Sequence, residues 1–173
     1  MKTVFIVRHA KSSWEYEGIQ DIDRPLKKRG IKDAYLVSKT LSNKLTKPDI
    51  FVSSSAIRAL HTAMIFAENF KYPLANLLIK KSLYNFSDGY LVKTIMALDD
   101  AFDTAIIFSH DHGISTFVNK YGNKSISHVP TCGVIGIQFD TEHWKSINKD
   151  KTIKKGKTIL FKTPKKIKNK QNI

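Results

Sequence analysis

Three separated segments of the sequence each place a histidine or an arginine just after a run of apolar, strand-like residues. Arg8 and His9 directly follow the first run, and His110 closely follows a later one. Arg58 comes one helical turn after another run, which ends in three serines. In an open α/β sheet, ligands bind beyond the carboxyl ends of the strands. We therefore expect these two histidines and two arginines to meet at one edge of a sheet.

Phosphoryl transfer is the chemistry that suits this set. A neutral imidazole is a good nucleophile near pH 7, and arginines bind phosphate oxygens through planar, permanently charged forks. The sequence contains no G-x-x-x-x-G-K-[ST] phosphate loop. Its single cysteine, Cys132, lies at the entrance to an apolar strand rather than in a loop, so it is not a candidate nucleophile.

The elements that must position these residues alternate between strands and helices along the chain. Such alternation predicts a three-layer α/β/α fold with a mostly parallel central sheet and helices on both faces. Ser55 is placed to cap the second helix. The predicted strands cover residues 3–7, 50–52, 77–79, 104–108, 134–139 and 158–161, and the predicted helices cover residues 27–45, 56–70, 87–102 and about 111–122.

Length and composition fit one globular domain, because domains usually have roughly 100–200 residues and this chain has 173, of which 42% are hydrophobic. We assign residues 1–163 to that domain and residues 164–173 to a basic C-terminal tail. No apolar run approaches the ~20 residues of a membrane span, and the start of the chain lacks the features of a signal peptide. We expect a cytoplasmic protein.

The formal net charge of +14 is concentrated near the C-terminus, because residues 151–173 hold nine lysines and no acid. One interpretation is that solvent-exposed lysines lie on the last strand and that the chain after this strand is frayed. The other is a surface for an acidic partner. Dedicated nucleic-acid binding is disfavoured, because this segment lacks arginine and has only Phe161 as a stacking ring.

Four segments together resemble the histidine phosphatase (phosphoglycerate-mutase-like) superfamily, and in particular its compact SixA-type branch of phosphohistidine phosphatases. The likeness runs from about residue 3 to residue 139. The segments are V-R-H-A at 7–10, D-R-P-L-K-K-R-G at 23–30, S-S-S-A-I-R-A-L-H-T-A at 53–63 and F-S-H at 108–110.

This resemblance implies a role for each matching residue. His9 would attack phosphorus and become a phosphohistidine intermediate, which water would then hydrolyse. Arg8, Arg58 and a protonated His110 would hold the phosphoryl oxygens, without a metal or other cofactor. Three further residues are candidates for substrate binding: Ser12, Ser13 and Arg24. For each of these, a role within the loop or turn is an equally good interpretation.

The sequence departs from the family pattern at several positions. Ala10 replaces the usual glycine, Ser55 the usual proline and His61 the usual glutamine. Members that act on phosphate esters carry a carboxylic acid after the third strand, and here Asn85 stands where we would look for it. General acid help is typically worth 10²–10⁴-fold when the leaving group is poor. A phosphorylated imidazole leaves more easily, so the missing acid favours a phosphoramidate substrate.

The sequence thus predicts a metal-independent phosphatase that acts on protein phosphohistidine. A phosphatase for small phosphate esters is one alternative, and a non-catalytic module that binds phosphate or other anions is another.

Overall fold

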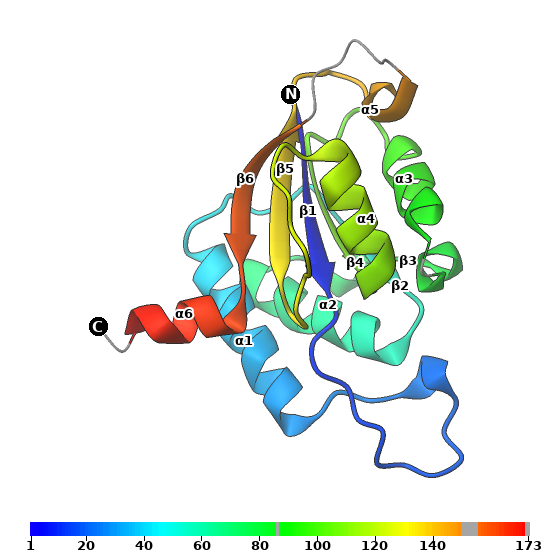
Figure 1. Cartoon of the computed structure of the whole chain (residues 1–173), viewed down its shortest axis with the longest axis vertical. Helices are drawn as coiled ribbons and strands as arrows, with labels where there is room; N and C mark the ends of the chain where they lie inside the picture. The colour runs from blue at the N-terminus through cyan, green and yellow to red at the C-terminus, as the bar shows by residue number, and fades with distance from the viewer. Residues whose placement is uncertain (86, 150–155, 172–173) are drawn as a thin grey trace.

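The computed structural model describes residues 1–85, 87–149 and 156–171. One six-stranded sheet, in the order β3-β2-β4-β1-β5-β6, forms the centre of the molecule (Figure 1). The strands are β1 Lys2–Arg8, β2 Ile50–Ser54, β3 Leu78–Lys80, β4 Thr104–Ser109, β5 Val134–Phe139 and β6 Lys157–Lys162. The α-helices are α1 Lys28–Ser42, α2 Ile57–Phe70, α3 Asp88–Met96, α4 Asp111–Tyr121, α5 Ser146–Lys149 and α6 Pro164–Gln171. Short 3₁₀ turns are η1 Asp21–Asp23, η2 Leu74–Asn76 and η3 Lys81–Tyr84.

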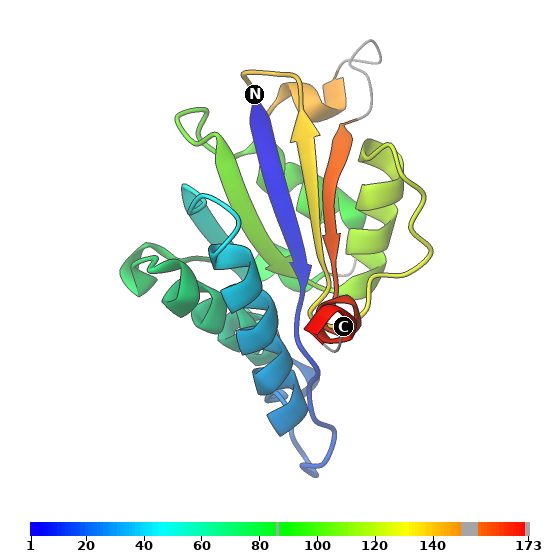
Figure 2. The same cartoon turned by 90° about the vertical axis from the view of Figure 1, so that its left-hand side faces the viewer.

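The predicted α/β/α architecture is confirmed. Strands β3, β2, β4 and β1 run parallel, whereas β5 is antiparallel to β1 and β6 is antiparallel to β5. Helices α1 and α2 lie on one face of the sheet, and α3 and α4 lie on the other (Figures 1 and 2). Because both faces are covered, the central strands are apolar throughout rather than alternating with polar residues.

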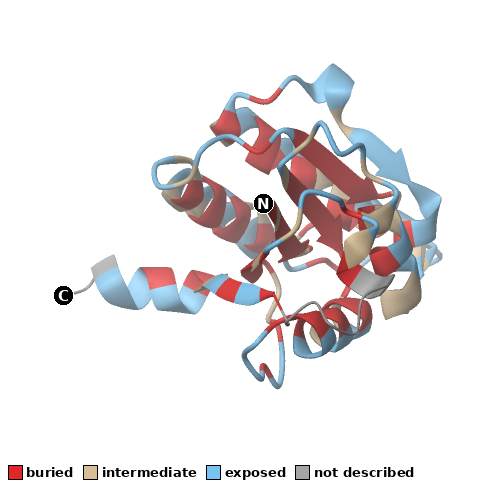
Figure 3. Cartoon of the chain, turned by 90° about the horizontal axis from the view of Figure 1, so that it is seen from above, coloured by how far each residue is buried: buried red, intermediate tan, exposed pale blue. Residues whose placement is uncertain are grey.

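The residues of β1 show how the sheet divides the core. Val4 and Ile6 belong to the apolar cluster beneath α3 and α4, and Phe5 and Val7 belong to the cluster beneath α1 and α2. This alternation follows from the two-residue period of a strand. Figure 3 shows the buried residues on the strands and on the inner sides of the helices. Strand β1, which ends at Arg8, is therefore packed against helices on both of its faces.

The end predicted for the third helix and the cap predicted for the second helix were wrong. The third helix ends at Met96 rather than 102, because a turn follows in which Asp99 Oδ1 accepts a hydrogen bond from the backbone of Ala101 at 2.9 Å. Ser55 does not cap α2: Ala56 is the N-cap residue, and Ser54 Oγ accepts the Ala56 N–H at 3.3 Å.

The segment after β6 also differs from the expected frayed end, since residues 164–171 form α6. Thr163 Oγ1 accepts the backbone N–H of Lys166 at the start of this helix. Ile167 is only 6% exposed and packs into the cluster beneath α1 and α2. Lys168 Nζ lies 2.6 Å from the buried Asp33 carboxylate of α1. Part of the lysine-rich segment therefore belongs to the folded domain. None of the described helices is long and apolar enough to cross a lipid bilayer.

We expect Ile167→Ala to lower the free energy of unfolding by about 2 kcal/mol, near the lower end of the usual cost of truncating a buried isoleucine. Urea unfolding followed by circular dichroism measures this change. Lys165→Ala, an exposed position in the same helix, serves as the matched control and should leave the unfolding midpoint nearly unchanged. Equal midpoints for the two variants would show that α6 does not contribute to stability.

Candidate active site

The carboxyl ends of three neighbouring strands bring the candidate residues together. Arg8 ends β1 and pairs in register with Ser109, the last residue of β4. His9 and His110 therefore follow at adjacent positions, and their ring centroids are 5.3 Å apart. Arg58 reaches the same place from the first turn of α2, which follows β2. All four side chains lie at one edge of the sheet.

His9 presents Nε2 in the form a nucleophile needs. Its Nδ1 lies 2.8 Å from the Ala10 carbonyl oxygen, which can only accept a hydrogen bond, so Nδ1 carries the proton. Nε2 then keeps its lone pair and accepts a hydrogen bond from Arg58 Nε at 3.3 Å. Burial and the neighbouring arginine charges lower the pKa of His9 to about 4. The imidazole is neutral at pH 7.

Arg58 is a buried cation that links the two histidines, with only 2% of its surface exposed. Besides His9, it approaches His110 Nδ1 through Nη2 at 3.5 Å. A cation near a helix N-terminus opposes the helix dipole, so this placement has a cost. The cost is offset by Asp21, whose carboxylate Oδ2 lies 3.0 Å from Arg58 Nη2.

His110 is 1% exposed, and its Nε2 lies 2.9 Å from Ser54 Oγ. Burial, and then the nearness of His9 and Arg58, lower its pKa to about 3. His110 is therefore neutral at pH 7 in this structure, whereas the family resemblance implies a protonated form. An arriving phosphoryl group would raise this pKa, because a nearby negative charge favours the imidazolium.

Arg8 is held at the mouth of the site by the loop before β5 and by α4. Its Nη1 donates to the Val129 carbonyl at 2.8 Å and lies 3.0 Å from Asp111 Oδ2. Its Nε is buried without a hydrogen-bond partner among the described residues, as is the hydroxyl of Ser55, which follows β2 at the same edge. Buried donors of this kind are costly unless a ligand accepts from them.

The three further candidates lie together in the loop after His9. Arg24 Nη2 donates to Ser12 Oγ at 2.6 Å, and Arg24 Nε donates to the Ser13 carbonyl at 2.9 Å. Ser13 Oγ accepts from the Glu15 backbone, which is a turn contact. Here these two serines shape the loop and hold Arg24. The positive charge of Arg24 also helps to lower the pKa of His9.

Asp21, which the sequence analysis missed, joins the arginines of the site. Its carboxylate binds Arg24 Nη1 at 2.8 Å, Arg58 Nη2 at 3.0 Å and the Tyr84 hydroxyl at 2.7 Å. Burial alone would raise the pKa of Asp21, but the bonds from Arg24 and Tyr84 and the charge of Arg58 lower it to about 2. Asp21 is thus a partly exposed anion among the cations of the site. Its position three residues before Arg24 was the available sequence signal.

The residue after the nucleophile is positioned by α2. The Ala10 N–H donates to Thr62 Oγ1 at 3.0 Å, and this hydroxyl donates to the Arg58 carbonyl at 2.7 Å. Ala10 is fully buried, and its backbone does not adopt the left-handed conformation that would require glycine. The substitution of glycine by alanine is therefore compatible with the local backbone.

No group of three histidine, cysteine, aspartate or glutamate side chains that could hold one metal ion is found among the described residues. Asn85 stands where the family pattern would place the acid, and its Oδ1 accepts the backbone N–H of Ser87 at 3.1 Å. Ser87 in turn caps α3 by accepting the Gly89 N–H.

We expect kcat/KM for a small chromogenic phosphate to fall on the acid side with an apparent pKa near 4. The low pKa values of about 4 for His9 and about 3 for His110 mean that protonation removes the nucleophile only well below pH 6. The profile must be corrected for ionisation of the substrate. Its apparent pKa then describes the coupled pair of histidines rather than either ring alone. An acid limb near 6.5, the ordinary value for histidine, would contradict a buried neutral pair.

Replacing Asp21 by asparagine should strengthen inhibition by inorganic phosphate, because the carboxylate competes with a bound anion for Arg58 and Arg24. We expect the inhibition constant to fall by roughly threefold to tenfold, a typical effect of one nearby charge. Asp23→Asn is the matched control, since Asp23 is an exposed acid in the same turn η1. An inhibition constant that is unchanged or higher in Asp21→Asn would mean that Asp21 serves only to hold the arginines.

Comparison with known proteins agrees with this geometry. Residues 4–83 match the family model of the histidine phosphatase superfamily (branch 1). An uncharacterised chloroplast protein of Arabidopsis thaliana is 27% identical over 152 residues, covering 83% of this chain and 69% of that protein.

Two solved structures share the fold. The protein assigned as phosphohistidine phosphatase SixA of Agrobacterium tumefaciens superposes with a TM-score of 0.79 at 20% identity, covering 94% of this chain and 98% of that one. The protein histidine phosphatase SixA complexed with tungstate gives a TM-score of 0.79 at 18% identity, covering 95% of this chain and 99% of that one. The family match over residues 4–83, together with the arrangement of its histidines and arginines, makes this chain similar to the histidine phosphatase superfamily.

Proposed function

We propose that this phosphatase hydrolyses phosphohistidine in proteins, with His9 as the nucleophile. The observation that carries the proposal is a neutral His9 Nε2 facing Arg58, whose carboxylate partner Asp21 is ionised at pH 7. The fold it shares with SixA proteins supports the same substrate class.

In the first step His9 Nε2 attacks the phosphorus of the substrate in line with the bond that breaks. A new N–P bond forms at His9, and the N–P bond to the substrate histidine breaks. When the other ring nitrogen of the substrate is protonated, the leaving group departs as neutral imidazole, so no proton donor is needed. Arg8, Arg58 and His110 bind the three phosphoryl oxygens, where charge lies during the transfer. The negative charge of the incoming group raises the pKa of His110, so that His110 would take up a proton from solvent and add a third positive charge.

In the second step a water attacks the phosphorus bound to His9. The His9–phosphorus bond breaks, inorganic phosphate is released and Nε2 regains its lone pair. The proton that the water loses leaves with the phosphate product or passes to solvent. The hydrogen bond from Nδ1 to the Ala10 carbonyl keeps the ring in the same tautomer and orientation throughout both steps.

The carboxylates near the site favour a phosphoramidate over a phosphate ester. Asp21, with a pKa of about 2, is ionised at pH 7 and cannot protonate an alkoxide. Asp111 is engaged by Arg8 at 3.0 Å. Asn85 at the expected acid position has no ionisable proton. An imidazole leaving group tolerates this arrangement, whereas an alkoxide loses the 10²–10⁴-fold that a general acid typically supplies.

A substrate panel tests the proposal. We expect the highest kcat/KM on phosphohistidine peptides and much lower values on phosphoserine peptides, phosphotyrosine peptides and sugar phosphates. Faster hydrolysis of a sugar phosphate than of a phosphohistidine peptide would favour the ester phosphatase instead. Binding of phosphate without turnover of any member of the panel would favour a non-catalytic module.

A further inference from the structure

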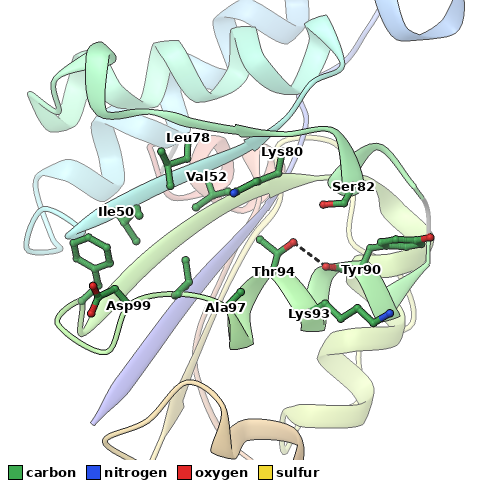
Figure 4. Close-up of a pocket in the computed structure, with 12 residues that line it drawn as sticks. Ile50, Val52, Leu78, Lys80, Ser82, Tyr90, Lys93, Thr94, Ala97 and Asp99 are labelled. Carbon is green, nitrogen blue, oxygen red and sulfur yellow. Dashed lines mark hydrogen bonds between the residues drawn. The ribbon is translucent and has the colours of Figure 1, made fainter.

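A groove runs between the edge strand β3 and helix α3 (Figure 4). Its volume is about 460 Å³. The groove exists because α3 has only nine residues and leaves this end of the sheet uncovered. Its walls are largely apolar and include Ile50, Val52, Leu78, Leu98 and Phe102.

The rim of this groove exposes apolar surface that has no cover among the described residues. Leu78 of β3 and Tyr90 of α3, which both line the groove, are each 41% exposed. In the described part of the chain, β3 pairs with β2 alone, so its outer edge is open. Open edges and apolar rims of this kind are typical of surfaces that bind another chain.

The charges on the groove are mainly positive at one end. Lys93 lies at the end shared with Ser82 and Tyr90, the Lys80 side chain extends from β3 toward Val52, and Asp99 lies at the opposite end (Figure 4). Across the described residues, no carboxylate is within ion-pair distance of Lys80 or Lys93, or of the neighbouring Lys81. These lysines therefore offer their charge to a bound molecule.

The positive end of the groove leads to the active site. Ser82 and Tyr90 also line a second hollow, of about 550 Å³, whose other lining residues include Lys81 and Tyr84. The Tyr84 hydroxyl donates to the Asp21 carboxylate that holds Arg58, and the Tyr84 ring meets His110 edge-on, with 5.7 Å between centroids. A chain lying in the groove and across the hollow would thus arrive at the catalytic edge.

We propose that this groove docks a segment of the phosphorylated protein that carries acidic and apolar side chains next to its phosphohistidine. The apolar side chains fill the groove, and the carboxylates pair with Lys80 and Lys93. A second copy of this chain is a poorer occupant, because its net charge is also +14 and it would bring more lysines to the positive rim. This inference rests on the proposed phosphohistidine phosphatase activity and adds the recognition of the substrate protein.

The test compares three substrates: free phosphohistidine, a phosphohistidine peptide with flanking leucine and glutamate, and the same peptide with lysine in place of glutamate. We expect the wild-type enzyme to prefer the acidic peptide over the lysine peptide by about tenfold in kcat/KM, mainly through KM. The double variant Lys80→Glu/Lys93→Glu should lose this preference or reverse it. Its rate on free phosphohistidine should change less than twofold, because neither lysine contacts the four candidate catalytic residues.

Two further variants separate a docking groove from general attraction. Lys32→Glu/Lys39→Glu makes the same change in net charge on α1, on the opposite face of the sheet, and should keep the preference. Ala97→Trp fills the groove without changing charge, since Ala97 lines it and is exposed. It should raise KM for both peptides severalfold and leave free phosphohistidine unaffected.

The outcomes distinguish this proposal from the one on which it rests. Failure of the wild-type enzyme to hydrolyse any of the three phosphohistidine substrates would overturn the proposed function. Equal rates on the two peptides, or equal losses in the groove and α1 variants, would overturn the docking groove and leave the phosphatase activity standing. A wild-type dimer in sedimentation that Ala97→Trp converts to a monomer would assign the groove to a second copy of the chain.

Discussion

His9→Ala is expected to abolish turnover, with a loss of at least about 10⁴-fold in kcat on a phosphohistidine peptide. The reason is that His9 Nε2 keeps its lone pair and lies 3.3 Å from Arg58 Nε, whereas His110 Nε2 lies 2.9 Å from Ser54 Oγ. Acid-labile, base-stable label should accumulate on the wild-type enzyme when a ³²P-labelled substrate is quenched during turnover. His9→Ala should carry none of this label.

The matched control for this prediction is His143→Ala. His143 is a surface histidine whose Nδ1 lies 2.9 Å from Asp100 Oδ2, outside the catalytic edge. It should keep both the rate and the label. Label that persists in His9→Ala would assign the phosphorylated intermediate to another residue, and His110 would then be the first to examine.

Arg58→Ala is expected to lower kcat/KM by about 10²–10³-fold, the usual cost of removing one charged donor to a developing anion. The side chain touches His9 through Nε and approaches His110 through Nη2. Its loss removes a phosphate ligand and also the contact that fixes the attacking nitrogen. Arg58→Lys should recover only part of the rate, because an ammonium group lacks the planar fork.

The variant should still fold, because Asp21 keeps its bonds to Arg24 and Tyr84 when Arg58 is removed. Circular dichroism and an unfolding curve check this point. Arg29→Ala, an arginine that is 79% exposed on α1, provides the control and should be nearly as active as the wild type. A rate for Arg58→Ala within threefold of wild type would remove Arg58 from the phosphoryl site.

The grouping of the four candidate catalytic side chains could be predicted because each follows a strand of a parallel sheet. Arg8 and His9 end one strand and His110 ends its neighbour, so the position in sequence fixes the position at the edge. The position of Arg58 could be predicted because the link between β2 and α2 is short and places the start of α2 at the same edge. The roles of these residues stay predictions until the variants are measured.

The anionic part of the site could not be predicted in the same way. Asp21 lies in a polar segment with no regular period, and its contacts with Arg58 and Tyr84 join residues 37 and 63 positions apart. The low pKa values of the two histidines likewise depend on burial, which a sequence does not show. The expected imidazolium at His110 was derived from the family, and the pKa of about 3 differs from it.

The errors at α3 and α6 have different causes, one local and one tertiary. Residues 97–102 continue the apolar pattern of α3, but the Asp99 side chain binds the backbone and ends the helix. Helix α6 was overlooked because its lysines suggested a solvated end. Only the tertiary contacts of Ile167 and Lys168 explain why it folds.

The pairing of β1 with β4 has a consequence for biosynthesis. Thr3 pairs with Thr104, so about a hundred residues of nascent chain must be made before the first strand finds this neighbour. Closing a loop of that length is slow compared with forming local helices. His9 therefore leaves the ribosome long before His110. A nascent chain that ends before residue 110 lacks one of the two rings. Phosphatase activity should first appear late in synthesis, and its onset would report that the distant strands have joined.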